Sequence, residues 1–388
     1  MKGAPLDIVV IGLSLRSAWG NGHATTYRAL LGALEARGDR VLFLERDVPW
    51  YAQNQDAADE LPGRLSLYAD LDALQDRHAD DVANADLVIV GSYVPQGTEV
   101  GRWAQRAARG VVAFYDIDTP VTLAALAQGR CAYVDTEAIA GYDLYLSFSG
   151  GPALDTLQQR YGARMAVPLY CSADPERYFP EEREVEYDLG YMGTYSDDRQ
   201  PVLDRLLLQP ARTWDEGRFV VAGPQYPDTV QWSRNVERIE HLPPSGHRGF
   251  YNLQRFTLNL TRADMVAMGH SPSVRLFEAA ACGTPIVSDP WAGLDALFAP
   301  GKEILIAQSG AQALHWVQGM PDAMRRRIGL AARTRFLAEH TPAHRAQSLH
   351  TYFERAAARR SRATSPRLSG NRRTSHEQAF VPSDHRPQ

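Results

Sequence analysis

The segment from Ser271 to Ser288, SPSVRLFEAAACGTPIVS, carries residue types that suit the binding of a phosphorylated ligand. Ser271 and Pro272 predict the start of a helix, because serine can accept from the first free amides and proline needs no N–H partner there. Gly283 predicts the end of this helix, and the residues after it predict a buried strand. The free N–H groups and the positive end of the helix dipole would attract a diphosphate.

Spacing of three and four residues places Ser271, Val274, Arg275 and Glu278 on one side of this predicted helix. Its other side would face a core through apolar residues. The Glu278 carboxylate could accept two hydrogen bonds from vicinal hydroxyls, such as those of a ribose. A surface ion pair between Arg275 and Glu278, worth about a few tenths of a kcal/mol, explains the same spacing equally well.

Two carboxylates, Asp116 and Asp118, follow a strand expected at 111–115. The carboxyl ends of strands are the functional edge of open α/β sheets, so one of them could orient a substrate hydroxyl or stabilise a cationic transition state. We favour Asp118, although the following Thr119-Pro120 opens a helix and makes a plain N-cap role for Asp118 equally plausible. Carboxylates at this spacing can also hold a divalent cation, but we expect no metal site here.

A glycine loop, Gly20-Asn21-Gly22, follows the first expected strand and precedes a helix that begins near His23. Glycine lets the backbone approach a phosphate or a sugar closely, although an isolated Gly-Asn-Gly is often a plain turn. The loop lacks the GxGxxG spacing, which disfavours a dinucleotide site of the dehydrogenase kind.

Short apolar strands alternate with helical stretches, which predicts parallel sheets covered by helices on both faces. In the first half we expect strands at 6–12, 40–45, 86–91, 111–115 and 143–148, and helices at 23–37, 96–109 and 119–128. In the second half we expect strands at 187–193, 218–223, 236–240, 256–260, 285–288 and 303–307, and helices at 199–208, 245–254, 272–281 and 320–339.

This alternation divides the chain into two αβ units of similar size, as expected for two Rossmann-like domains with a ligand between them. We assign a first domain, a linker, a second domain, a C-terminal helix and a disordered polar tail to residues 1–170, 171–186, 187–341, 342–357 and 358–388. The tail is basic and without hydrophobic periodicity.

Composition fits an ordinary globular enzyme, with 388 residues, 44% hydrophobic residues and a net charge of −5. Nothing in it indicates a nucleic-acid partner, a membrane span or a disulfide framework. We therefore expect a cytoplasmic protein.

The string RLFEAAACGTPIVSD at 275–289 resembles the C-terminal signature of retaining GT-B glycosyltransferases. The chain as a whole resembles the CgeB-like, spore-maturation branch of that group, through SAWGNGHATTYRALLGAL at 17–34, FLERDVPWYA at 43–52 and DIDTP at 116–120. This resemblance implies a GT-B fold, in which the parallel sheets of two Rossmann-like domains face each other across a cleft. It also implies transfer of a hexose-type sugar from a nucleotide-diphosphate donor to an unknown acceptor, with retention of configuration and without a metal or other cofactor.

The resemblance assigns roles to residues at both sides of such a cleft. Glu278 would hold the ribose, the backbone from Ser271 to Val274 would meet the diphosphate, and Arg199 would stabilise the leaving group. The candidate catalytic residues are Asp118, Asp116 and His23. The candidate donor-binding residues are Gly20, Asn21, Gly22, Arg199, Arg262, His270, Ser271, Ser273, Val274, Arg275 and Glu278.

Two departures from the family pattern bear on these assignments. His270 stands where the family usually has a second acidic residue that contacts the donor sugar, and Thr194 stands where it usually has an arginine. Arg262 or Arg275 could replace that arginine. Two alternatives stay open: a nucleotide-sugar 2-epimerase, which shares the two-domain layout, and a non-catalytic protein that binds sugar nucleotides.

Overall fold

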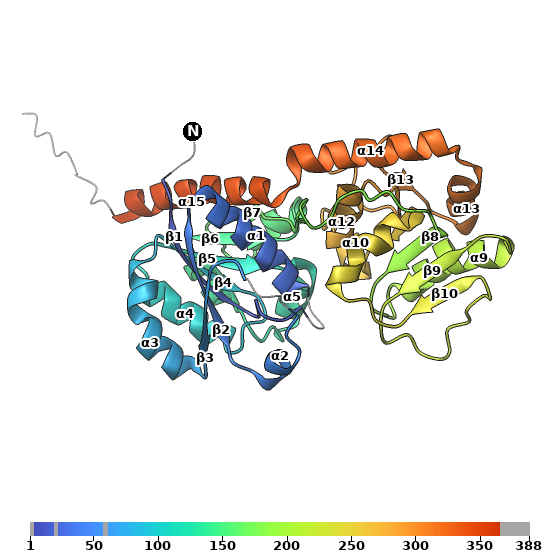
Figure 1. The fold of residues 1–388 in the computed structure, drawn as a ribbon. Coiled ribbons are helices and arrows are strands. Elements are labelled where there is room, and N and C mark those ends of the chain that lie inside the picture. Colours follow the sequence, from blue (N-terminus) through green and yellow to red (C-terminus); the bar gives the residue numbers. More distant parts are fainter. Residues whose placement is uncertain (1–3, 19–21, 57–60, 365–388) are drawn as a thin grey trace, which may run out of the picture.

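The computed structural model, which describes residues 4–18, 22–56 and 61–364, contains two parallel β-sheets with helices packed against both faces of each (Figure 1). The first sheet has the strand order β3-β2-β1-β4-β5-β6-β7, and the second has the order β10-β9-β8-β11-β12-β13. In both sheets the strand order reverses beside the first strand, between β1 and β4 in one and between β8 and β11 in the other. Ligands of open α/β sheets bind at such switch points.

The first sheet consists of β1 (Asp7–Gly12), β2 (Arg40–Arg46), β3 (Arg64–Tyr68), β4 (Leu87–Gly91), β5 (Val111–Asp116), β6 (Leu144–Ser147) and β7 (Ala166–Pro168). Its helices are α1 (His23–Arg37), α2 (Pro49–Gln53), α3 (Leu71–Asn84), α4 (Gly97–Ala107), α5 (Thr119–Ala127), α6 (Thr136–Gly141) and α7 (Pro152–Gln159). Helices α3 and α4 bury their apolar residues on one face of this sheet, and α1 does so on the other.

The second sheet consists of β8 (Tyr187–Met192), β9 (Phe219–Ala222), β10 (Val236–Ile239), β11 (Gln254–Asn259), β12 (Ile286–Ser288) and β13 (Leu305–Ile306). Its helices are α8 (Gln200–Leu203), the π-helical turn η1 (Asp204–Leu208), α9 (Gln209–Thr213), α10 (Pro244–Asn252), α11 (Ala263–Met268), α12 (Val274–Cys282), α13 (Gly310–Gly319) and α14 (Asp322–Glu339). Helix α12 is buried from Leu276 to Cys282, which places it in the core of this domain.

The last helix, α15 (Pro342–Thr364), follows α14 and returns to the first domain, where it lies beside α1 (Figure 1). The buried side chains of His350 and Asp39 lie 2.7 Å apart and connect α15 to the turn between α1 and β2. The prediction that a disordered tail begins at 358 is wrong for 358–364. Arg360 bonds to Asp143 and to the carbonyl of Ala108, and these contacts hold the last turns of α15 on the first domain.

All strands predicted from the sequence are present, with ends that differ by one or two residues. The sequence analysis missed β3 and β7 at the sheet edges and the helices α2, α3, α6, α7, α9, α11 and α13. In the described part of the chain, no helix combines the length and the apolar character needed to cross a membrane.

Candidate functional site

The two domains touch through loops that follow their strands. The amide of Gly150 donates to the carbonyl of His270 at 2.9 Å, and the hydroxyl groups of Ser149 and Ser271 bond to each other. Nearby, the guanidinium of Arg262 lies 4.0 Å from the carboxylate of Asp118. Because the loops after β5 and β6 meet the loops after β11 and α11, the carboxyl edges of both sheets border one interdomain site.

Asp118 is the carboxylate that the first domain presents at this site. It occupies the N-cap position of α5, but its Oδ2 accepts a hydrogen bond of 3.0 Å from the Tyr93 hydroxyl instead of capping the helix amides. Burial raises the pKa of Asp118, and Tyr93 and Arg262 act against this rise. The Asp118 side chain is 27% exposed and faces Arg262 of the other domain, so it is not a plain helix cap.

Asp116 occupies a different environment from its neighbour. It is completely buried, and its carboxylate accepts hydrogen bonds of 2.7 Å from the hydroxyls of Tyr145 and Thr122. Burial raises its pKa to about 6, although the hydrogen bonds oppose this. Its Oδ1 also accepts from the amide of Asp118 at 3.2 Å, so Asp116 shapes the loop that carries Asp118 rather than facing the cleft.

Tyr93 was missed by the sequence analysis. It follows β4 at the switch point of the first sheet, and its φ of 62° is rare for an aromatic residue and costs backbone energy. Its ring packs against Tyr133, with ring centroids 4.6 Å apart, and edge-on against His23 at 5.4 Å. The one signal in the sequence was its place directly after an apolar strand.

His23 begins α1 and is buried beside Tyr93. Burial lowers the pKa of His23 to about 4, so its imidazole is neutral near pH 7. Of the preceding glycine loop, Gly20 and Asn21 lie outside the described residues. Gly22 is the N-cap of α1, and a methyl group added there would meet no described atom within 4 Å.

Arg199 and Arg275 form a cationic side of the site in the second domain. Arg199 donates to the Thr194 carbonyl at 2.7 Å, and Arg275 donates to the Leu260 carbonyl at 3.3 Å and lies over the ring of Tyr191. Burial lowers the pKa of Arg199, and repulsion by Arg275 adds to this. Two guanidinium groups that repel each other at the switch point between β8 and β11 favour binding of an anion.

Helix α12 begins later than predicted, at Val274, with Ser273 at its N-cap position. The hydroxyl of Ser273 donates to Asn259 at 2.7 Å, and Ser271 is buried with its hydroxyl bonded to the Gly269 carbonyl. The expectation that Ser271 caps the helix is therefore wrong. Ser273, Val274 and Arg275 are partly exposed, so the first turn of α12 lies at the surface of the site, near Arg199.

His270 is a contact between the domains in this structure. It has a φ of 50°, and its ring lies between two glycines. A methyl group at Gly151 would lie 2.4 Å from its Cδ2, and one at Gly293 would lie 2.2 Å from its Nδ1. The ring thus fills the space between loops of both domains, at the position where an acidic residue was expected.

Glu278 is 2% exposed, so the expectation that it lies on an open helix face is wrong. Its Oε2 accepts from the Tyr251 hydroxyl at 2.8 Å, and its Oε1 lies 3.9 Å from Nδ1 of His247. Burial opposes ionisation, but the neighbouring His247, Tyr251 and Tyr178 outweigh it and lower the pKa of Glu278. Contact with a ribose remains a prediction for this residue.

Asp289, another residue that the sequence analysis did not single out, follows β12 at the same edge. Its Oδ1 accepts from the amide and the hydroxyl of Thr261 at 3.2 and 3.0 Å. Burial raises the pKa of Asp289 to about 6, and Arg275 acts against this. Asp289 is the last residue of the PIVSD string, and its position directly after a predicted buried strand could have marked it as a candidate site residue.

A cavity of about 530 Å³ opens at the opposite edge of the first sheet, where the strands begin, and is lined by Asp7, Arg40, Arg64, Asp81 and their neighbours. Its charged residues pair with each other, as Arg40 does with Asp7 and Arg64 with Asp81. The residues that could do chemistry lie at the other edge, so we place the candidate site there and not in this cavity.

Solved structures with the same architecture identify the fold. Sucrose-phosphate synthase from Thermosynechococcus elongatus aligns with a TM-score of 0.68 and 13% identity, over 91% of this chain and all of that one. The chain has the GT-B fold. Anabaena Alr3699/HepE in complex with UDP and glucose aligns with a TM-score of 0.64 and 12% identity, over 90% of this chain and all of that one.

An α-glucosyltransferase in complex with UDP and a 13-mer DNA is a third GT-B relative in structure, with a TM-score of 0.68, 12% identity, and 91% and 100% coverage of the two chains. Residues 199–351 match the sequence model of a family described as glycosyl transferase-like. No curated protein matches the chain in sequence. The matched region begins at Arg199 and contains Arg262, Arg275 and Glu278 of the second domain.

Proposed function

We propose that this protein is a glycosyltransferase that moves a sugar from a nucleotide-diphosphate donor to an acceptor. The observation that carries the proposal is the pairing of unlike surfaces across the GT-B cleft. The second domain presents Arg199, Arg275 and the first turn of α12, and the first domain presents Asp118. The glycosyl transferase-like match over 199–351 supports the same activity.

The cationic side suits the leaving group of such a transfer. When the bond between the anomeric carbon and the phosphate oxygen breaks, the nucleoside diphosphate gains negative charge. Fixed guanidinium groups and the amides of a helix N-terminus stabilise that charge without rearranging. We therefore propose a reaction that needs no metal ion, with Arg199 and Arg275 next to the diphosphate and Arg262 at the border with the acceptor.

Asp118 suits the acceptor side of the reaction. The new bond joins the acceptor oxygen to the anomeric carbon, and the acceptor hydroxyl must lose its proton. Asp118 would accept a hydrogen bond from that hydroxyl, and its raised pKa makes it a better acceptor for a proton than an ordinary aspartate. His23, neutral near pH 7, would border the same space.

Finer features of the proposal rest on the resemblance seen in the sequence. We propose retention of configuration, a hexose as the transferred sugar, membership of the CgeB-like branch and action in the cytoplasm. UDP bound to the structural relatives makes UDP-glucose the first donor to test.

The test is turnover of nucleotide sugars by the purified chain. UDP-, GDP-, ADP- and dTDP-sugars are each incubated with the protein and a mixture of acceptors, and release of nucleoside diphosphate is measured together with transfer of the sugar. We expect one donor to be consumed, and Asp118→Asn to slow this by at least about a hundredfold, within the usual range for loss of a general base. Asp76→Asn, on the exposed surface of α3 and away from the cleft residues named above, controls for loss of a surface carboxylate in the same domain.

Transfer at the wild-type rate by Asp118→Asn would remove Asp118 from the mechanism. Binding of a donor without any turnover would favour a non-catalytic protein. Conversion of the donor sugar into its epimer without an acceptor would show an epimerase.

A further inference from the structure

Helices α14 and α15 concentrate positive charge in a chain that is acidic as a whole. Residues 322–364 contain ten arginines and three carboxylates, a net charge of +7, whereas the whole chain carries −5. The rest of the chain is therefore strongly negative. Such a separation of charge orients a protein in front of a charged partner.

The two helices lie on the outside of both domains. Figure 1 shows α14 and α15 one after the other along one side of the molecule, with α14 over the second domain and α15 over the first. With 18 and 23 residues, they are about 27 Å and about 35 Å long. Their outward faces therefore form a long strip, which suits an extended partner better than a small ligand.

Large apolar side chains are exposed on this strip. Three of the five exposed large hydrophobic residues in the described part of the chain, Met324, Leu330 and Leu337, belong to α14. Leu330 is 64% exposed, and Leu337 lies two helical turns later on the same face. This face points away from the second domain, because the buried residues Ile328 and Phe336 lie on the other side of the helix. Exposed apolar residues that gather on one element mark an interaction site.

Arginines flank these leucines and continue along α15. The side chain of Arg326 is 75% exposed, and Arg327 is exposed beside it. On α15, Arg355 and Arg362 are exposed and lie two turns apart, on a face directed away from the buried Leu349. Arg327, Arg355 and Arg362 form no ion pair with a described carboxylate, so no described carboxylate neutralises their charge.

The combination of leucine and arginine on one face selects the partner. Anionic lipids attract guanidinium groups to their headgroups, and the layer below the headgroups accepts apolar side chains. A nucleic acid offers phosphates but little apolar surface for Leu330 and Leu337, and no aromatic residue described on α14 or α15 is exposed enough to stack on bases. A second copy of this strip would bring like charges together. The lipid surface is the partner that satisfies both kinds of side chain.

We propose that the outward faces of α14 and α15 form a docking surface for anionic lipid bilayers. Leu330 and Leu337 insert below the headgroups, and Arg327, Arg355 and Arg362 bind lipid phosphates. The same bilayer repels the negative remainder of the chain, which fixes the orientation of the protein. None of the cleft residues belongs to this surface, so the proposal does not depend on the proposed glycosyltransferase function.

The test measures cosedimentation of the purified chain with vesicles. Vesicles of phosphatidylcholine alone are compared with vesicles of phosphatidylcholine and phosphatidylglycerol in equal parts. We expect the wild type to bind the anionic vesicles and not the neutral ones. Raising the salt concentration from about 0.1 M to about 0.5 M should release the protein, because salt screens the attraction between arginines and headgroups.

Two variants separate charge from insertion. Arg327→Gln combined with Arg355→Gln and Arg362→Gln should weaken binding to the anionic vesicles by at least about tenfold. Leu330→Ser combined with Leu337→Ser should weaken it by about fivefold, since two apolar side chains no longer enter the bilayer. All five positions are exposed, and urea unfolding of each variant checks that it is folded.

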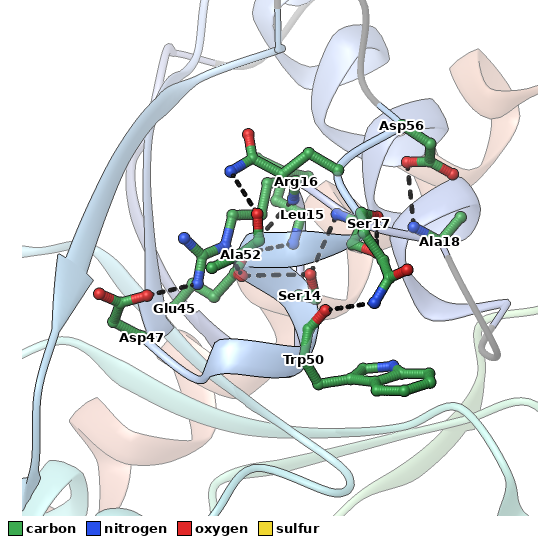
Figure 2. A network of polar contacts seen from close by, with 12 residues as sticks. Ser14, Leu15, Arg16, Ser17, Ala18, Glu45, Asp47, Trp50, Ala52 and Asp56 are labelled. Atoms are coloured by element: carbon green, nitrogen blue, oxygen red, sulfur yellow. Dashed lines mark hydrogen bonds and ion pairs between the residues drawn. The ribbon is translucent and has the colours of Figure 1, made fainter.

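Matched controls carry the same kinds of substitution elsewhere. Arg77→Gln, Arg109→Gln and Arg234→Gln together remove three exposed arginines outside both helices. Trp50→Ser removes an apolar side chain that is 55% exposed, whose indole Figure 2 shows directed away from the polar network beside it. Both controls should bind anionic vesicles as the wild type does.

Three results would overturn the proposal. The first is a wild type that does not bind anionic vesicles or binds neutral vesicles equally well. The second is binding by the arginine or the leucine variant that is as tight as that of its control. The third is binding of a DNA duplex, titrated in parallel, without binding of vesicles, which would make a nucleic acid the partner of this strip.

Discussion

The two sides of the cleft differ in both charge and origin. The second domain contributes Arg199 and Arg275 and the start of α12, most of it from one continuous segment. The first domain contributes Asp118, Tyr93 and His23, each from a different strand end, with the carboxylate paired to Tyr93 and the imidazole neutral. Under the proposed function, the second domain would bind the anionic leaving group and the first domain would bind the neutral acceptor hydroxyl.

This difference predicts that the two sides of the cleft bind different kinds of groups. A diphosphate is recognised by charge, so its side needs cations in a fixed arrangement. A neutral acceptor is recognised by hydrogen bonds and shape, so its side needs groups whose charge is controlled by burial. Variants on the two sides should therefore fail in different ways.

The largest effect is expected from removal of both arginines. Arg199→Ala combined with Arg275→Ala should raise the Kd of a bound nucleotide sugar by at least about a hundredfold, because hydrogen bonds to charged groups contribute about 1.5–3 kcal/mol each. Titration calorimetry of the donor measures this. Arg212→Ala, which removes a surface partner of Asp204, is the control and should leave donor affinity unchanged. Equal affinity of the double variant and the control would show that these arginines do not bind the donor.

The next effect concerns stability at acidic pH. The folded-state pKa of His23, about 4, lies below its ordinary value of 6.5, so between these pH values the unfolded state binds a proton that the folded state does not. Stability should fall as the pH falls through this window, by about 1.4 kcal/mol per pH unit from this residue. His340, also with a pKa of about 4 because of burial, adds a similar slope. The free energy of unfolding in urea is measured at pH 7, 5.5 and 4.5, and it should fall less for His23→Gln than for the wild type. An equal fall in both proteins would show that His23 is not neutral and buried in the folded state.

A smaller effect is expected for Tyr93→Phe. It keeps the ring and removes the hydroxyl that lowers the pKa of Asp118. The pKa of Asp118 should rise further, so the acidic limb of the pH–rate profile for transfer should move to higher pH, with a loss of about 1 kcal/mol in transition-state stabilisation. Donor affinity should not change. An unmoved acidic limb would show that Tyr93 does not act through Asp118.

The smallest effect is expected for Gly22→Ala. Its φ of −87° suits alanine and a methyl group would meet no described atom within 4 Å, so the free energy of unfolding should change by less than about 0.5 kcal/mol. If the loop approaches the donor or the acceptor, the added methyl group should still slow transfer. Unfolding in urea and the transfer assay measure the two effects separately, and a stable variant with full activity would place the ligand away from Gly22.

Much of the fold follows from local sequence. Continuous apolar strands and helix signals such as Gly283, with its φ of 70°, are local properties, and they predicted the two parallel sheets. The missed strand β3 is an edge strand with half-buried residues, so it lacks the continuous apolar run of the central strands. Helix α3 is rich in charged residues, which hid its three buried positions.

The site was only partly predictable because it depends on strand order. Arg199, Arg275 and Asp118 could be selected as candidates from the sequence because they lie at expected strand ends or in a recognisable segment. Tyr93 was missed because its backbone strain and its bond to Asp118 arise only when β4 lies beside β5. The local helical pattern also placed Glu278 on an open face, whereas packing against Tyr251 of α10 buries it.

The most direct test of the account is a thermal-shift panel of nucleotide sugars with wild type, Glu278→Ala and the double arginine variant. The account predicts that one donor at 100 times its Kd stabilises the wild type by about 2.7 kcal/mol, and that both variants lose most of this gain. No stabilisation of the wild type by any nucleotide sugar, or an undiminished shift in both variants, would contradict it.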